Sequence, residues 1–64
     1  MNKCVVFNTK SGEKLVYRCS NVDEPVIGDH IIVYDLDGSV RTQVRKDKVI
    51  SYKLYEAAEV SMKP

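Results

Sequence analysis

Short runs of β-branched and aromatic residues alternate with turn-forming residues along all 64 positions of this chain. Valine, isoleucine and tyrosine suit the pleated, half-buried surface of a strand. Glycine, proline, asparagine and aspartate, which separate the runs, are the residues that tight turns favour. Short strands with turns at such close spacing are typical of a β-sandwich or a small β-barrel. We therefore expect a mainly β, antiparallel fold.

The runs predict five strands in a single domain of residues 1–55, with a C-terminal tail of residues 56–64. The strands are expected at residues 3–8, 13–19, 30–35, 39–45 and 49–55. Residues 20–24 form a polar connection, and residues 25–29, Pro-Val-Ile-Gly-Asp, form a turn with an apolar anchor. The tail has room for a turn or two of helix, but a helix this short is stable only when it docks on the rest of the chain.

A chain of this size has a marginal core, because it buries only about 60 % of the surface that its unfolded form exposes. Such small domains usually depend on disulfides, a metal or self-association. Cys4, Cys19 and His30 lack the spacings of zinc sites, so no metal is expected. No apolar run reaches the length of a signal peptide or a membrane span, which predicts a cytoplasmic protein without disulfides or membrane contact. Self-association is the support that remains.

The first two strands predict a hairpin that turns after Thr9 and holds both cysteines. Thr9 pairs with Gly12 in one possible register and with Glu13 in the other. Neither register places Cys4 opposite Cys19, and a disulfide needs neighbouring Cβ atoms. We therefore expect two buried, free thiols. Alternation along the second strand places three side chains on one face, namely Leu15, Tyr17 and Cys19.

The Asp-Gly pair at positions 37–38 is the strongest hairpin signal, because glycine tolerates the positive φ of a tight turn. A two-residue turn points Ile31 and Val33 toward the core. It leaves Ile32 and Tyr34 on the opposite face. A three-residue loop with a bulge at the glycine exchanges these pairs, because a one-residue slip flips every side chain of a strand. On the facing strand, the residues expected in the core are Val40, Thr42 and Val44.

Either register places an apolar pair on the face that carries two arginines and a glutamine. Such a mixture of aromatic, aliphatic and arginine side chains resembles the composition of protein interfaces. For the two-residue turn, the candidate interaction face consists of Ile32, Tyr34, Arg41, Gln43 and Arg45. The alternative is that the rest of the chain covers this face. We expect a small non-enzymatic interaction module, either a homo-oligomer or a binder or inhibitor of a partner protein.

A second hypothesis is the binding of single-stranded nucleic acid, in which tyrosines stack on bases and basic residues contact phosphates. The candidate contacts are Lys46, Lys48, Lys53, Tyr52 and Tyr55. An isoelectric point near 7.8 argues against this, because dedicated nucleic-acid binders are strongly basic. A third hypothesis is a small molecule or nucleotide bound at a subunit interface, with the basic face holding its phosphate.

No arrangement of residues suggests catalysis. His30, the one histidine, follows Asp29, but neighbours along a strand point to opposite faces. No serine or cysteine has an identifiable activating partner, and the glycine-rich phosphate-binding motifs are absent. We therefore expect neither an enzyme nor a bound cofactor.

An apolar-Gly-Asp-x-apolar element, Val26 to Val33, opens the third predicted strand. With the Asp37-Gly38 hairpin, Val44 and Val49-Ile50, it resembles the SH3-like small β-barrel proteins of bacteria and phages, over roughly residues 3–55. The resemblance implies a five-stranded antiparallel SH3-like barrel or β-roll and fits an accessory protein of bacterial or phage type. It does not extend to the RNA-binding loop of Sm-like proteins or to the aromatic groove that binds Pro-rich peptides.

Overall fold

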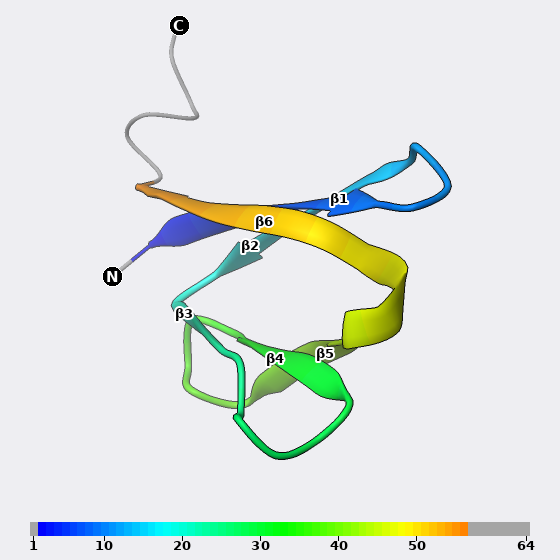
Figure 1. Ribbon diagram of the computed structural model, residues 1–64. Coiled ribbons are helices and arrows are strands. Elements are labelled where there is room, and N and C mark those ends of the chain that lie inside the picture. The colour runs from blue at the N-terminus through cyan, green and yellow to red at the C-terminus, as the bar shows by residue number, and fades with distance from the viewer. Residues whose placement is uncertain (1, 57–64) are drawn as a thin grey trace, which may run out of the picture.

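The computed structural model describes residues 2–56, which form six strands and one short 3-10 helix (Figure 1). The strands are β1 (Lys3–Thr9), β2 (Lys14–Cys19), β3 (Asn21–Asp23), β4 (His30–Tyr34), β5 (Val40–Arg45) and β6 (Val49–Glu56). The helix η1 (Lys46–Lys48) lies between β5 and β6. The predicted tail of residues 56–64 falls outside the described residues, apart from Glu56 at the end of β6. Within residues 2–56, no helix is long and apolar enough to cross a membrane.

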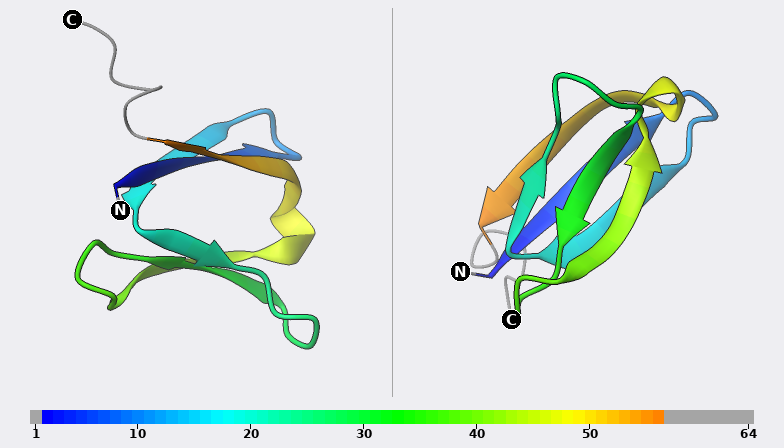
Figure 2. Two further views of the ribbon diagram at one scale, coloured as in Figure 1. Left: turned by 90° about the vertical axis from the view of Figure 1, so that its left-hand side faces the viewer. Right: turned by 90° about the horizontal axis from the view of Figure 1, so that it is seen from below.

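The strands form two three-stranded antiparallel sheets, in the orders β2-β1-β6 and β3-β4-β5. The sheets lie over one another as two layers (Figure 2). β2 continues through Ser20 into β3, and β5 continues through η1 into β6, so the chain passes between the sheets at two places. Ser20 fixes the first passage. Its N–H donates to the carbonyl oxygen of Tyr34 at 2.9 Å, and its Oγ donates to that of Asp35 at 2.7 Å.

The prediction of a mainly β, antiparallel fold is confirmed, but its finer details differ from the structure. Six strands are present among the described residues instead of five, because residues 21–23, expected in a polar connection, pair with β4. Val22 points inward between two exposed polar neighbours, which is the alternation of a strand. The two sheets remain separate and are not closed into a barrel.

The core lies between the two sheets and is built from alternate residues of their strands. Its buried members are Val5, Phe7, Cys19, Ile31, Val33 and Val44. Phe7 is fully buried, and its ring centroid lies 6.1 Å from that of Tyr17 and 5.4 Å from that of Tyr52. Leu15 and Tyr17 also pack against the core, as Cys19 does, so these three residues share one face of the second strand as predicted.

The first hairpin adopts the register in which Thr9 pairs with Glu13. The N–H of Thr9 donates to the carbonyl oxygen of Glu13 at 3.1 Å, and Gly12 takes the positive φ of 91° that the turn requires. Cys19 then lies opposite Lys3 on the core side, whereas Cys4 lies on the outer side of the sheet. Both thiols are buried and free, and burial raises the pKa of the Cys19 thiol.

The turn of the second hairpin is the three-residue loop, with Gly38 at a φ of 92°. The N–H of Asp35 donates to the carbonyl oxygen of Ser39 at 2.7 Å, and the N–H of Gly38 donates to that of Asp35 at 3.0 Å. On its own, this loop would turn Ile32 and Tyr34 toward the core.

A β-bulge in β5 reverses that consequence. Tyr34 pairs with Val40, but Val33 pairs with Thr42, so Arg41 is an extra residue without a partner. Beyond the bulge, β4 and β5 have the register expected of a two-residue turn, and Val33 is fully buried. The hairpin therefore has the turn of one predicted alternative and the strand register of the other.

Two large hydrophobic residues are exposed because of bulges. Val40 is 52 % exposed, because the bulge at Arg41 pairs it with Tyr34 on the outer face of the sheet. Ile50 is 68 % exposed, because a second bulge leaves it unpaired between Val49 and its neighbour Ser51. The expectation of Val40 in the core was therefore wrong, since an extra residue interrupts strand alternation.

Candidate protein-interaction surface

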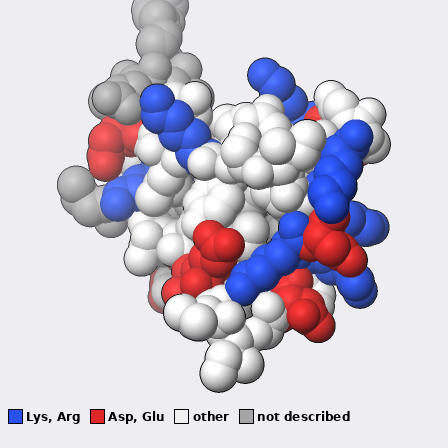
Figure 3. All heavy atoms as spheres, viewed as in Figure 1, with Lys and Arg blue, Asp and Glu red and all other residues white. Residues whose placement is uncertain are grey.

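The loop of residues 25–29, between β3 and β4, carries the most exposed large hydrophobic side chains of the described chain. Val26 is 99 % exposed and Ile27 is 91 % exposed. The apolar anchor predicted for this turn is therefore wrong as a core contact, because both side chains point into solvent. We call residues 25–29 the apolar loop. The apolar loop projects beyond β4 on the side away from sheet β2-β1-β6 (Figures 1 and 2). Figure 3, which has the same view as Figure 1, shows the lowest part of the molecule in white, the colour of uncharged residues.

Contacts from η1 and β6 hold the apolar loop at both of its ends. At one end, the hydroxyl of Tyr52 donates to Glu24 Oε1 at 2.9 Å, and the ammonium of Lys46 donates to the carbonyl oxygen of Pro25. At the other end, the N–H of Lys46 donates to the carbonyl oxygen of Asp29 at 2.8 Å. Because these contacts come from residues far along the chain, the loop has a defined position before anything binds to it.

Tyr52 joins the apolar loop to the core. Its ring packs against Phe7 while its hydroxyl reaches Glu24. Burial raises the pKa of Tyr52, and the hydrogen bond to Glu24 raises it further, because both favour the neutral phenol.

The structure places four residues of the predicted interaction face, Ile32, Tyr34, Gln43 and Arg45, on the outer face of sheet β3-β4-β5, whereas Arg41 is the unpaired residue of the bulge. Ile32 and Tyr34 are half-buried on the central strand β4. Gln43 lies opposite Ile32, and Asp23 of β3 flanks Ile32 on its other side. This face thus has an apolar centre and a polar margin, and Val40 adds an exposed apolar side chain opposite Tyr34.

Both arginines of the predicted face already have carboxylate partners. Arg41 Nη1 lies 3.3 Å from Asp35 Oδ2, and Arg45 Nη2 lies 2.9 Å from Asp47 Oδ2. The hydrogen bond from Arg45 lowers the pKa of the Asp47 carboxyl. Exposed ion pairs contribute little to stability, but each one offsets the charge that its arginine would present to a partner. The apolar residues are therefore the stronger part of this face.

The structure divides the five residues that were candidates for nucleic-acid contact. Lys53 and Tyr55 lie on the outer face of β6, where the Lys53 ammonium is 5.2 Å from the ring centroid of Tyr55. Tyr52 points inward, and Lys46 is bound to the apolar loop. Lys48 lines a groove at the end of the molecule. The five residues do not share one surface.

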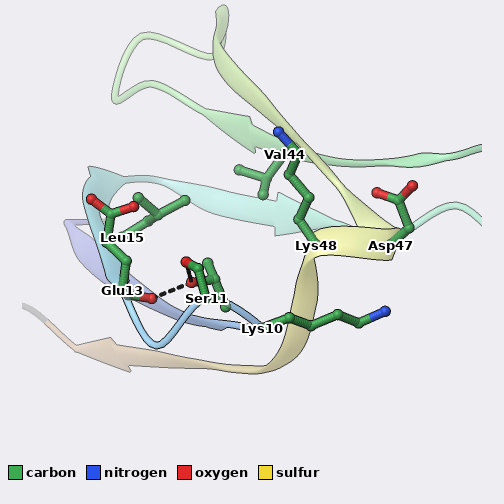
Figure 4. A pocket seen from close by; sticks show the side chains of 8 residues that line it. Lys10, Ser11, Glu13, Leu15, Val44, Asp47 and Lys48 are labelled. Atoms are coloured by element: carbon green, nitrogen blue, oxygen red, sulfur yellow. Dashed lines mark hydrogen bonds between the residues drawn. The ribbon is translucent and has the colours of Figure 1, made fainter.

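That groove has a volume of about 420 Å³ and lies between the first hairpin, β5 and η1 (Figure 4). Leu15 and Val44 form its apolar part. Its polar residues are Thr9, Lys10, Ser11, Glu13, Asp47 and Lys48. The side chain of Lys10 points away from the groove (Figure 4), and acidic and basic groups are present in equal number, so the groove has no excess of positive charge to hold a phosphate. Among residues 2–56, no cluster of three or more histidine, cysteine or acidic side chains could hold a metal ion.

Sequence reasoning missed the exposure of the apolar loop. Pro25 and Gly28 bracket Val26 and Ile27, so two apolar residues lie within a very short turn. Nothing in this run separates an apolar anchor from an exposed tip, because the contacts that hold the loop come from Lys46 and Tyr52, far along the chain.

Comparison with known proteins finds no matching family model, no similar curated protein and no similar solved structure. The structure itself describes the molecule as a small β protein of two sheets, with an exposed apolar loop that is held at both of its ends.

Proposed function

We propose that this chain is a non-catalytic interaction module that associates with other copies of itself through the apolar loop and the neighbouring outer face of β4. The exposure of Val26 and Ile27 on a loop held at both ends carries the proposal. A loop that is already ordered loses little conformational entropy when it binds, which favours association.

The apolar loop can contribute a useful part of a binding energy. Complete burial of a valine or isoleucine side chain is worth about 1.5–3 kcal/mol, so Val26 and Ile27 together supply roughly 3–6 kcal/mol. Association costs about 4–15 kcal/mol, so a stable contact needs more surface than these two side chains. Ile32 and Tyr34, which are half-buried on the same face of β4, are the apolar residues that would add this surface.

A second copy is the occupant that the small core favours. The described chain buries only seven hydrophobic residues, including Cys4 on the outer side of its sheet. Domains of this size commonly gain stability by association, because the contact buries apolar surface that a single copy leaves in water. The exposed β-branched residues at the tip of the apolar loop are the apolar surface that would lose most contact with water when two copies associate.

The test is the molar mass of the purified protein over a range of concentrations, measured by sedimentation equilibrium. We expect the wild-type mass to rise with concentration and Val26→Ser/Ile27→Ser to stay monomeric with an unchanged circular dichroism spectrum. Leu36→Ser is the matched control, because Leu36 is an exposed hydrophobic residue on the loop at the other end of β4. A wild type that is monomeric throughout, or a double variant that assembles as the wild type does, would overturn the proposal.

We further propose that the fold is an open variant of the SH3-like small barrel. Two features support this: β2 and β3 form one bent segment that serves both sheets, and a single 3-10 turn joins the last two strands. Nuclear Overhauser contacts between backbone protons of β3 and β4, with none between β2 and β5, would support the open variant. Contacts between β2 and β5 would show a closed barrel instead, and absence of the β3–β4 contacts from an assigned spectrum would reject the SH3-like interpretation.

A further inference from the structure

We infer that the apolar loop of one copy docks on the outer face of sheet β2-β1-β6 of the next copy, which makes the assembly head-to-tail. This inference rests on the proposed function, since it names the surface that receives the loop. It is carried by two surfaces of the same chain that are complementary in charge and in apolar content.

The outer face of sheet β2-β1-β6 follows from the strand register. Val6 lies between Val16 of β2 and Lys53 of β6, Cys4 lies between Arg18 and Tyr55, and Asn8 lies between Lys14 and Ser51. We call these nine residues the basic face. Three of them are cationic and none is acidic. Among the described residues, Lys14, Arg18 and Lys53 have no ion-pair partner, in contrast to the arginines of the other sheet.

The basic face has an apolar centre. Val16 is 59 % exposed and lies beside Val6, its cross-strand partner on the central strand β1. Lys14 and Arg18 lie on either side of Val16 along β2 and share its face. An apolar side chain that docks on the two valines would therefore have cations close to it.

The apolar loop has the opposite arrangement. Val26 and Ile27 are preceded by Asp23 and Glu24 and followed by Asp29, and residues 21–29 contain no lysine or arginine. The ammonium of Lys46, which reaches the loop from η1, is bonded to a backbone carbonyl oxygen. Two β-branched side chains with acidic neighbours thus match two valines with basic neighbours, and such complementarity directs which surfaces meet.

The two surfaces lie on opposite sides of the molecule. The apolar loop projects away from sheet β2-β1-β6, whose outer face is the basic face (Figures 1 and 2). A copy therefore cannot dock its loop on its own basic face. Contact between copies uses two different surfaces, and a contact of this kind repeats to form a ring or an open chain.

A single-stranded nucleic acid is the competing ligand for a cationic sheet face. Such ligands are usually held by several aromatic side chains on which successive bases stack. On the basic face Tyr55 is the single aromatic residue, because Phe7, Tyr17 and Tyr52 point toward the core. An acidic and apolar protein surface fits the basic face better.

The experiment uses two variants that each lack one half of the contact. Val26→Ser/Ile27→Ser removes the apolar loop, and Lys14→Glu/Arg18→Glu reverses the charge of two exposed residues on the basic face. Each variant alone should be monomeric, with its dissociation constant raised roughly a hundredfold or more. Mixed in equal amounts, they should form a heterodimer that grows no further, because only one intact loop and one intact basic face remain to pair. Lys10→Glu/Lys48→Glu is the matched charge reversal away from the basic face and should assemble as the wild type does.

The outcomes separate this inference from the proposed function. If the loop variant is monomeric but Lys14→Glu/Arg18→Glu assembles normally, the loop docks elsewhere and only the inference fails. If two monomeric variants form no heterodimer when mixed, the head-to-tail contact is also refuted. If the wild type is monomeric, both proposals fail. Fluorescence anisotropy with a labelled oligo-dT and a labelled RNA tests the competing ligand. Binding that is lost only in Lys14→Glu/Arg18→Glu, together with unchanged self-association, would assign the basic face to nucleic acid and overturn the inference.

Discussion

Tyr52→Phe is the substitution that tests whether the apolar loop is held in place by the core. It removes the hydroxyl that donates to Glu24 at 2.9 Å and retains the ring that packs against Phe7. A hydrogen bond of this kind contributes about 0.5–1.5 kcal/mol, and because this one is exposed we expect a loss of about 0.5–1 kcal/mol in the free energy of unfolding.

Urea denaturation of the wild type, Tyr52→Phe, Glu24→Gln and the double variant forms a cycle that isolates the interaction between the two side chains. Tyr55→Phe is the control, because its hydroxyl lies on the same strand and makes no hydrogen bond among the described residues. Amide hydrogen exchange should also become faster at residues 26–29 in Tyr52→Phe and should not change in the control. Unchanged exchange in the loop, with no coupling between Tyr52 and Glu24, would refute the idea that this contact holds the loop.

The same contact gives a dependence on pH with a defined sign. The pKa of Tyr52 is raised above its ordinary value of 10.0 in the folded state, so the neutral phenol is favoured there. Its contribution to stability is fully present below the unfolded pKa and is lost as the pH rises through the folded pKa. The stability difference between the wild type and Tyr52→Phe should therefore shrink when unfolding is measured at increasingly alkaline pH above 10. A difference that is constant through this range would contradict the assignment.

Three further predictions concern the second hairpin. Ile31→Ala should lower the free energy of unfolding by about 2–5 kcal/mol, because Ile31 is buried, whereas Ile32→Ala on the outer face should cost clearly less; equal losses in urea denaturation would contradict the register. Gly38→Ala should cost about 1–2 kcal/mol in thermal or urea unfolding, because its φ of 92° is strained for a residue with a Cβ; an unchanged midpoint would mean that the turn relaxes into another form. The hydrogen bonds from Ser39 lower the pKa of Asp37, so this carboxylate supports the fold above its unfolded pKa and ceases to do so as the pH falls through the folded value. Ser39→Ala should raise the Asp37 pKa in an NMR titration, and an unaltered titration would show that the backbone N–H alone sets it.

Strand alternation and turn chemistry predict a large part of this fold. The β-branched runs identified the main strands, and the Asp-Gly signal at 37–38 located the second hairpin. The bulge at Arg41 could not be predicted, because Val40 suits either face of a strand and nothing in its type shows which side it takes. The strand β3 was missed for a related reason. Val22 is the single apolar residue among its neighbours, so the alternation of apolar and polar residues there is too short to indicate a strand.

The candidate surface was predictable in its location and less so in its chemistry. Alternation brought Ile32 and Tyr34 to the face of Gln43 and Arg45, as expected for one register, whereas the bulge leaves Arg41 unpaired. The carboxylates that pair with the arginines are those of Asp35, in the hairpin turn, and Asp47, in η1. Whether they lie within ion-pair distance of the arginines depends on backbone geometry that the order of residues does not give. The exposure of the apolar loop was missed because the apolarity of Val26 and Ile27 was taken as a sign of burial.

The bulges at Arg41 and Ile50 have a consequence for how the length of this chain can vary. Loss of a residue inside a strand ordinarily exchanges the two faces of everything beyond it. Here the two residues that flank each bulge already point to opposite faces of the sheet, as direct neighbours in a regular strand do. Val40 and Thr42 flank Arg41 in this way, and Val49 and Ser51 flank Ile50. Removal of Arg41 or Ile50 would therefore leave every remaining core side chain in its place. These two positions are sites where a one-residue insertion or deletion can be inherited without a change of fold.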